Sequence, residues 1–457
     1  MASRRLALNL AQGLRGRAGG LSLPSRRGLA TPHSSPAIKT ETTTLKNGLT
    51  VATQYSPYAQ TSTVGVWIDA GSRAETAETN GTAHFLEHLA FKGTSKRTQH
   101  QLELEIENMG GHLNAYTSRE NTVYFAKAMN DDVPQCVDIL QDILQNSKLE
   151  EAAIERERDV ILRESEEVEK QVEEVVFDHL HATAYQGQSL GRTILGPREN
   201  IRDITRTELS NYVKNNYTAD RMVLAGAGGI PHQQLVEMAD RYFSKLPSKS
   251  PETSAYALSK KKPDFIGSDV RIRDDTIPTA NIAIAAIVGN YDKALGNAPH
   301  QGSKLSGIVH KNDLANSYMS FSTSYSDTGL WGIYLVTDKL GSVDDLVHFA
   351  LREWSRLSSN VTEAEVERAK AQLKASILLA LDGTTAVAED IGRQIVNTGR
   401  RMSPGEIERV IDAITEKDVM EFANRRLWDQ DIAISAVGSV EGLFDYARVR
   451  ADMSRNF

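Results

Sequence analysis

Cysteine is nearly absent from this 457-residue sequence, in which Cys136 is the only one. A disulfide within the chain is therefore excluded, and this composition is typical of a protein in a reducing compartment. We expect Cys136 to be a small core residue, because it lies in a helical pattern from 133 to 144. The sequence also lacks any run of 18 apolar residues, so no transmembrane helix is predicted.

Acidic residues are missing from the first 38 positions, which contain six arginines and several serines. Such a composition is typical of a mitochondrial transit peptide, and the alternative is a disordered basic tail. Arg27-Gly28-Leu29 is a candidate processing point, with an arginine at the second position before the cut. Removal of the six arginines takes the net charge from −8 to about −14. A chain this acidic should repel nucleic acid and attract cationic partners.

The most informative motif is His84-Phe85-Leu86-Glu87-His88. In a helix, His84 and His88 lie one turn apart on one face, where two neutral imidazoles can bind one divalent metal ion. Glu87 lies on the same side, close enough to act as a general base on a water molecule. This H-x-x-E-H pattern predicts a zinc-dependent hydrolase. The alternative is an ordinary pair of histidines on an amphipathic helix.

A tetrahedral zinc site also needs a third protein ligand and an open position for water. The acidic stretch 149–180 is the strongest candidate region, and its pattern predicts one long amphipathic helix. Glu157 and Glu164 are seven residues apart, so they share a face of that helix. Composition alone does not choose Glu164 among its acidic neighbours, because a run of charges is usually a solvated helix face.

The segments HFLEHLAFKGT and ERDVILRESEEVEK together resemble the pitrilysin (inverzincin) family of zinc peptidases. The resemblance covers nearly the whole chain after its first 41 residues. It implies one zinc ion per chain, bound by His84, His88 and Glu164. It also implies Glu87 as the catalytic base and Glu157 as a second catalytic residue, which supports the ligands from behind.

The same resemblance implies substrate contacts in two places. The segment 110–120 resembles the family's edge strand beside the metal, which pairs with the backbone of the substrate. Within it the implied substrate-binding residues are Leu113, Asn114, Ala115 and Thr117. The segment ESEEVEKQVEEVVFDH implies that Glu174 and Asp178, on the same predicted helix as Glu164, bind the arginine just before the cut. From charge pattern alone, these two are acids on a solvated face.

The sequence contains an internal repeat. Residues 204–217 match 414–427 at an offset of 210, and 149–156 match 361–368 at an offset of 212. Each half alternates strand patterns with long amphipathic helices, which predicts an α+β fold of two homologous lobes, each a mixed sheet with helices packed on one face. The expected divisions are a transit peptide (1–38), an N-terminal catalytic zinc-binding lobe (39–246), a linker rich in Pro, Ser and Lys (247–263) and a C-terminal degenerate lobe without a metal site (264–457).

The second half lacks the proposed metal site. Every proposed metal-site residue of the first half is replaced at the matching position, and the replacements are Gly302, Leu305, Ser306, Ala369 and Ser376. Duplication followed by loss of one site explains this selective replacement. A purely structural His-Glu-His cluster gives no reason for it.

Within the family, the resemblance is strongest to the heterodimeric enzymes that remove transit peptides from proteins imported into mitochondria. It implies a zinc metalloendopeptidase of the mitochondrial matrix, or of the matrix face of the inner membrane, that acts on cationic presequence peptides. The resemblance also implies an α subunit with a Gly-rich loop as a partner. No such loop occurs in this sequence, so the α subunit would supply it in trans. One alternative is a core subunit of the respiratory cytochrome bc complex (complex III), assembled with its other subunits. Another is a self-sufficient peptide-degrading enzyme.

Overall fold

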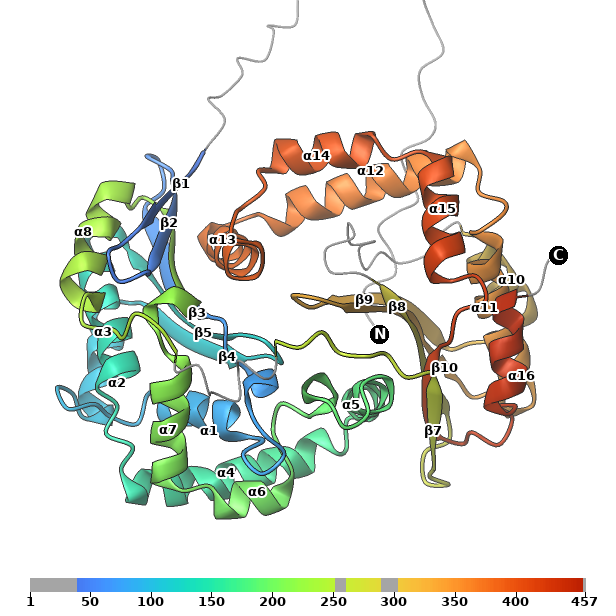
Figure 1. The fold of residues 1–457 in the computed structure, drawn as a ribbon, viewed down its shortest axis with the longest axis horizontal. Helices are drawn as coiled ribbons and strands as arrows, with labels where there is room; N and C mark the ends of the chain where they lie inside the picture. The colour runs from blue at the N-terminus through green and yellow to red at the C-terminus, as the bar shows by residue number, and fades with distance from the viewer. Residues whose placement is uncertain (1–38, 251–259, 289–302, 455–457) are drawn as a thin grey trace, which may run out of the picture. The chain divides into compact units, whose positions relative to one another are not determined.

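The computed structural model describes residues 39–250, 260–288 and 303–454 (Figure 1). The expected transit peptide, its candidate processing point, Gly302 and part of the expected linker lie outside these residues. Contacts within 39–457 group that part of the chain into one unit. The predicted α+β architecture is confirmed: there are two mixed sheets, one in each half of the chain, and each is packed against helices.

The first sheet has six strands in the order β1-β2-β6-β3-β5-β4. Only β2 and β6 pair in parallel, and the other neighbours are antiparallel. Because side chains alternate along a strand, Val64 and Val66 of β3 face one side of the sheet and Trp67 the other. The strands are β1 (Thr40–Thr44), β2 (Thr50–Tyr55), β3 (Thr61–Ile68), β4 (His112–Thr117), β5 (Thr122–Met129) and β6 (Met222–Gly228).

The second sheet repeats the first. Its order is β7-β11-β8-β10-β9, which matches β2-β6-β3-β5-β4 of the first sheet, so β1 has no counterpart. The parallel pair is β7 with β11, as it is β2 with β6 in the first sheet. Each strand corresponds to one in the first sheet, so β9 occupies the edge position of β4. The strands are β7 (Ser268–Arg273), β8 (Ala280–Val288), β9 (Ser317–Ser324), β10 (Gly329–Thr337) and β11 (Ala433–Gly438).

Helices of the same half cover one face of each sheet. In the first half, α1, α3 and α8 pack on the face that carries Val64 and Val66. In the second half, α10, α11 and α15 cover the face that carries Ile282 and Ile284. The helices of the first half are α1 (Thr82–Leu89), α2 (Gln99–Asn108), α3 (Val133–Gln145), α4 (Glu151–Val168), α5 (Val172–Ala184), α6 (Arg198–Asp203), α7 (Arg206–Asn216) and α8 (His232–Phe243). Those of the second half are α10 (Lys304–Asn312), α11 (Val343–Arg356), α12 (Glu363–Ala380), α13 (Thr384–Thr398), α14 (Pro404–Asp412), α15 (Glu416–Arg426) and α16 (Tyr446–Arg450).

The other face of each sheet is packed by one helix from the opposite half. Helix α13 lies against the first sheet, and α5 lies against the second (Figure 1). At the first contact the indole N–H of Trp67 donates to Glu389 at 3.0 Å, and Gly392 leaves room for the Trp67 ring. At the second, Val176 and Leu180 of α5 are fully buried. The two halves therefore exchange equivalent helices.

The prediction of one long helix over 149–180 is wrong, because the chain forms two helices, α4 and α5. The break at 169–171 contains neither glycine nor proline. Tertiary packing explains it, since α4 packs on the first half whereas α5 must turn away to bury its apolar side chains on the second sheet. Glu174 and Asp178 therefore lie on a different helix from Glu164.

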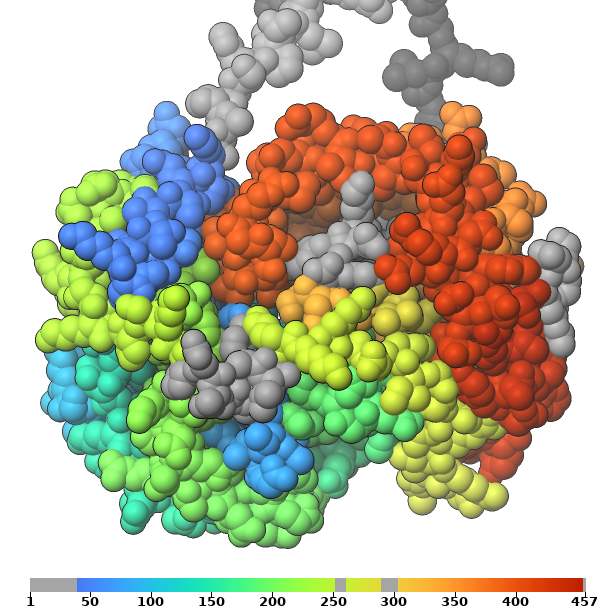
Figure 2. All heavy atoms as spheres, in the orientation of Figure 1, coloured from blue at the N-terminus to red at the C-terminus, as the bar shows by residue number. Residues whose placement is uncertain are grey.

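From residue 260 to 267 the connection between the halves lies mostly at the surface. There it passes beside the end of α5, where Ile266 N–H donates to Ala184 C=O at 2.9 Å. Figure 2 shows this part of the chain, in yellow, on the outside of the molecule. Among the described residues no helix is both long and apolar enough to cross a membrane. Cys136 is buried in α3, as expected, and burial raises the pKa of its thiol to about 11.

Candidate active site

Helix α1 carries the H-x-x-E-H motif. Its N-terminus is capped by Glu75, which lies several residues before the helix begins. Asn80-Gly81-Thr82 has the composition of a cap, but Gly81 adopts φ 107° and no side chain of the turn caps the helix. Instead the buried carboxylate of Glu75 accepts the backbone N–H groups of Gly81 at 3.0 Å and Ala83 at 2.7 Å. Nδ2 of Asn80 donates to the same carboxylate at 2.8 Å. These bonds satisfy helix N–H groups that would otherwise be buried without partners.

The structure brings His84, His88 and Glu164 together. Oε2 of Glu164, on α4, lies 3.8 Å from Nε2 of His84 and 3.1 Å from Nε2 of His88. One potential ligand atom from each residue lies within 4.8 Å of the others. Within the described part of the chain, this is the one such group of three histidine, cysteine or acidic residues. Neutral imidazoles with one carboxylate form a donor set typical of catalytic zinc.

Burial and charge at this group fit a metal ion. Burial, reinforced by the neighbouring His88, lowers the pKa of His84 to about 4, which leaves its imidazole neutral and able to bind a metal. Contact with His88 lowers the pKa of Glu164, so its carboxylate is ionised. Nδ1 of His84 and Oε2 of Glu164 are buried, and no well-formed hydrogen bond within the described residues satisfies them. A cation between these groups would satisfy the carboxylate oxygen.

Glu157 lies behind His88, on the side away from Glu164. Its Oε2 is 3.5 Å from Nδ1 of His88, and its Oε1 is 2.8 Å from Nζ of Lys92. It therefore approaches the side of the imidazole opposite to Nε2, which suits a residue that orients the ring. The sequence predicts Lys92 only as a cation that ends the helix at its C-terminal side, and it does not predict the contact with Glu157.

Glu87 lies half-buried between the group of His84, His88 and Glu164 and the edge strand β4. Burial raises the pKa of its carboxyl above the ordinary value, and the neighbouring Thr117 partly opposes that shift. Among the described residues, β4 pairs on one side only, with β5, so its other edge can accept a peptide strand. A cavity of about 520 Å³ adjoins this edge, and its lining includes Glu87, His88, Phe91, Leu113, Asn114 and Ala115.

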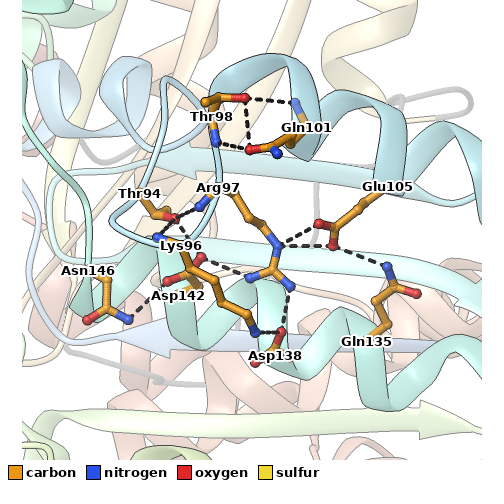
Figure 3. Close-up of polar contacts among 10 residues, drawn as sticks. All are labelled: Thr94, Lys96, Arg97, Thr98, Gln101, Glu105, Gln135, Asp138, Asp142 and Asn146. Carbon is orange, nitrogen blue, oxygen red and sulfur yellow. Dashed lines mark hydrogen bonds and ion pairs between the residues drawn. The ribbon is translucent and has the colours of Figure 1, made fainter.

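The buried Arg97 joins α2, which lines this cavity, to α3. Arg97 donates to Glu105 of α2 at 2.9 and 3.0 Å, and it contacts Asp138 and Asp142 of α3 at 2.5 and 2.9 Å (Figure 3). Thr94 completes the network through a 2.6 Å hydrogen bond to Asp142. The loop that follows the motif is thus fixed to both helices. Residues of α2 line one side of the cavity, so the network anchors that side to α3.

The two acids expected to bind the substrate arginine, Glu174 and Asp178, lie on α5, but only one of them is seen to form an ion pair with another described residue. Glu174 is exposed. Asp178 already forms an ion pair, with its Oδ1 2.6 Å from Nη2 of Arg119, just beyond the end of β4. Arg119 was not identified from the sequence, because nothing local indicates that it meets a residue 59 positions away.

The second half lacks this arrangement. Ala369 and Ser376 lie on α12, the counterpart of α4, and Leu305 and Ser306 lie on α10, the counterpart of α1. No group of three potential metal ligands occurs there among the described residues.

An H-x-x-E-H helix with a carboxylate from a second helix close to both histidines, on one lobe of a duplicated α+β fold, is the arrangement of a metallopeptidase. Residues 50–198 match the family model "Insulinase (Peptidase family M16)", and residues 203–373 match "Peptidase M16 inactive domain". The chain belongs to peptidase family M16.

Relatives support this membership over the full length. The chain is 83% identical to the mitochondrial-processing peptidase subunit beta of Neurospora crassa, with 100% of both chains covered. It is 52% identical to the subunit of the same name from Saccharomyces cerevisiae, over 90% of this chain and 94% of the relative. A chain in the solved structure "Complex III2 from Candida albicans, Inz-5 bound" aligns with a TM-score of 0.80 and 31% identity, over 91% of this chain and 100% of that one.

Proposed function

We propose that this chain is the catalytic β subunit of a mitochondrial processing peptidase, a zinc endopeptidase that removes N-terminal transit peptides from imported proteins. The observation that carries the proposal is the convergence of His84, His88 and Glu164, with Glu87 between them and the edge of β4. The names of the relatives give the reaction its biological setting.

One zinc ion per chain would be held by His84, His88 and Glu164. When bound, it supplies a Lewis acid that polarises the scissile carbonyl and makes water more acidic. Glu87 takes the proton of the attacking water on its carboxylate and passes it to the leaving amine as the C–N bond breaks. Glu157 keeps His88 oriented throughout.

The edge strand β4 supplies a track for the peptide. A substrate that runs antiparallel to β4 places its scissile bond near Thr117 and its residues after the cut near Leu113, Asn114 and Ala115. Arg119, the partner of Asp178, lies two residues beyond Thr117, or about 7 Å along an extended chain. This spacing supports Glu174 and Asp178 as the site for an arginine just before the cut. Backbone pairing suits substrates that share little sequence.

Charge and relatives support the remaining assignments. Without residues 1–38 the chain has a net charge of about −14, which favours cationic presequences over nucleic acid. We propose a heterodimer with an α subunit in the mitochondrial matrix. We also propose lobes at 39–246 and 264–457, joined by a linker at 247–263, with 1–38 as the chain's own transit peptide.

A second candidate function is that of a core subunit of complex III. Its support is the 0.80 TM-score to a chain in a complex III structure. The two functions are compatible if one polypeptide serves both. The complete set of His84, Glu87, His88 and Glu164 favours an active peptidase. Co-purification of the chain with cytochromes would support the structural function.

The test uses the chain with and without an α subunit, assayed on a presequence peptide. Glu87→Gln should abolish cleavage while zinc, measured by elemental analysis, stays near one per chain. Glu164→Gln should lower zinc occupancy, whereas Glu167→Gln, an exposed change on the same helix, should leave it intact. Full activity of Glu87→Gln would contradict the mechanism. Unchanged zinc in Glu164→Gln would move the third ligand elsewhere, with Glu157 as the next candidate.

A further inference from the structure

The turn between β9 and β10 of the second half docks onto the active-site side of the first. Ser326 donates to Glu120 twice, from its backbone N–H at 2.8 Å and from its hydroxyl at 2.7 Å. Asp327 accepts two hydrogen bonds from Arg73, at 2.9 and 2.6 Å. Arg73 also donates to Glu120 at 2.6 Å. Because Glu120 directly follows Arg119, this docking fixes the backbone at Arg119.

A third residue of the turn, Tyr325, is buried and contacts α5 of the first half. Its hydroxyl lies 2.7 Å from Nε2 of His181, whose Nδ1 lies 2.7 Å from the C=O of Phe177. A carbonyl only accepts, so Nδ1 carries the proton and Nε2 accepts from Tyr325. Burial, together with the charge of Arg119, lowers the pKa of His181 and keeps this ring neutral. The oxygen of Tyr325 therefore presents lone pairs, not a proton, to its surroundings.

Arg119 links this buried pair to the more exposed Asp178. Its side chain is 10% exposed, whereas Asp178, to which it is bound at 2.6 Å, is 34% exposed. Its guanidinium lies close enough to Tyr325 and His181 to influence the pKa of both. Arg119 thus holds Asp178 from its buried side. Since it engages Oδ1, a ligand that approaches from solvent meets Oδ2 and the exposed Glu174.

We propose that Arg119 is a positioning residue that sets the specificity of the acidic subsite, and that the second half holds it in place through the Tyr325–Thr328 turn. This inference rests on the proposed role of Asp178 as the acceptor for a substrate arginine. Two carboxylates and one resident guanidinium leave a net charge of −1, which matches a single substrate cation. When Arg119 fixes Asp178, the Oδ2 atom of Asp178 has one orientation. A fixed acceptor favours the planar guanidinium of arginine over the ammonium group of lysine. The half without a metal site thereby contributes to substrate choice.

The experiment uses the zinc-loaded heterodimer and two presequence peptides that differ only by Arg or Ala at the recognised position. The readout is the preference ratio, kcat/KM for the Arg peptide divided by that for the Ala peptide. Arg119→Met should lower this ratio about tenfold, the scale expected when a charge-assisted hydrogen bond loses its geometry, mainly through a higher KM for the Arg peptide. Arg119→Lys, which retains the charge but loses the fork, should recover part of it.

Tyr325→Phe keeps the buried ring and removes only the hydroxyl, so it tests the inference even if Arg119→Met does not fold. It should lower the ratio in the same direction by a smaller factor. The matched controls are Arg202→Met, at an exposed site, and Tyr334→Phe, which removes another hydroxyl from the second half. Neither should change the ratio.

Asp178→Asn separates this inference from the proposed function. If Asp178→Asn leaves the ratio unchanged, the arginine is bound elsewhere and the proposed subsite is wrong. If Asp178→Asn lowers the ratio while folded Arg119→Lys and Tyr325→Phe both leave it at the wild-type value, the subsite stands and the role of Arg119 is refuted. Loss of thermal stability without a change in ratio gives the same refutation, because it identifies a purely structural contact.

Discussion

The carboxylate of Glu75 accepts the backbone N–H of Ala83 at 2.7 Å, so a residue eight positions upstream caps the helix that carries His84 and His88, the two histidines proposed to bind the metal. Helix α1 has only eight residues and no capping side chain of its own. An isolated helix of that length is not stable in water. The orientation of His84 therefore depends on a contact made outside the helix.

Glu75→Gln should destabilise the fold by about 1–3 kcal/mol, because its amide NH₂ would face a donor where a carboxylate oxygen now accepts. It should also weaken zinc binding, since α1 loses its anchor. Urea unfolding and zinc titration of the apo chain measure the two effects. Glu78→Gln, three residues away and exposed, is the control. Unchanged zinc affinity in a destabilised Glu75→Gln protein would show that the cap does not orient the ligands.

Lys92→Met should weaken zinc binding by about tenfold or more, the effect usually seen when a partner of a metal ligand is lost. The reason is that Lys92 holds Glu157, which lies against Nδ1 of His88. Competition with a chelator measures the dissociation constant. Lys245→Met, at an exposed position, is the matched control. If Glu157→Gln weakens binding and Lys92→Met does not, Glu157 needs no cationic partner.

The sequence predicts the part of the site that is local. His84, Glu87 and His88 follow one another within a single helical turn, so their relation follows from helix geometry alone. Glu164 was identified only through the family resemblance, because its neighbours are equally acidic. The two-lobed α+β architecture was also predictable, since strand and helix patterns recur at a nearly constant offset.

Contacts between distant segments were not predictable. The ion pair between Arg119 and Asp178 joins two elements 59 residues apart, and the contact between Trp67 and Glu389 joins residues 322 apart. The break after α4 is of the same kind. No residue there favours a turn, and the chain bends because α5 finds its apolar partner in the other half. The spacing of apolar residues within one segment shows that it forms an amphipathic helix, but not which sheet that helix will cover.

Gly392→Ala should destabilise the protein by about 1–3 kcal/mol, as overpacking of a filled core does. A Cβ at this position of α13 would lie 2.1 Å from Cδ2 of the fully buried Trp67. Gly307→Ala is the matched control, because its Cβ would meet nothing within 4 Å in the middle of α10. That change should be neutral or slightly stabilising, since alanine has the higher helix propensity. Equal effects of the two substitutions on the unfolding midpoint would contradict the packing of α13 on the first sheet.

Glu365→Gln should reduce the loss of thermal stability that the protein undergoes as the pH falls from about 4.3 toward 2. Partial burial of Glu365 disfavours its charge, but hydrogen bonds from Thr362 and ion pairing with Arg356 outweigh this and lower its pKa to about 2. The pKa of an unfolded glutamate is about 4.3, so the folded state binds fewer protons than the unfolded state between these values. The contribution is therefore complete above about pH 4.3 and is lost as the pH falls toward 2.

The measurement is the difference in Tm between wild-type protein and Glu365→Gln from pH 7 to pH 2.5. We expect the wild-type protein to have the higher Tm at pH 7 and the difference to shrink steadily below about pH 4.3, where the wild-type carboxylate takes up its proton. Glu363→Gln changes the same charge in the first turn of α12 without a part in the capping box, so it isolates the effect of the capping contacts. Parallel curves for wild-type and Glu365→Gln protein across this range would mean that Thr362 and Arg356 do not hold the carboxylate in its ionised form.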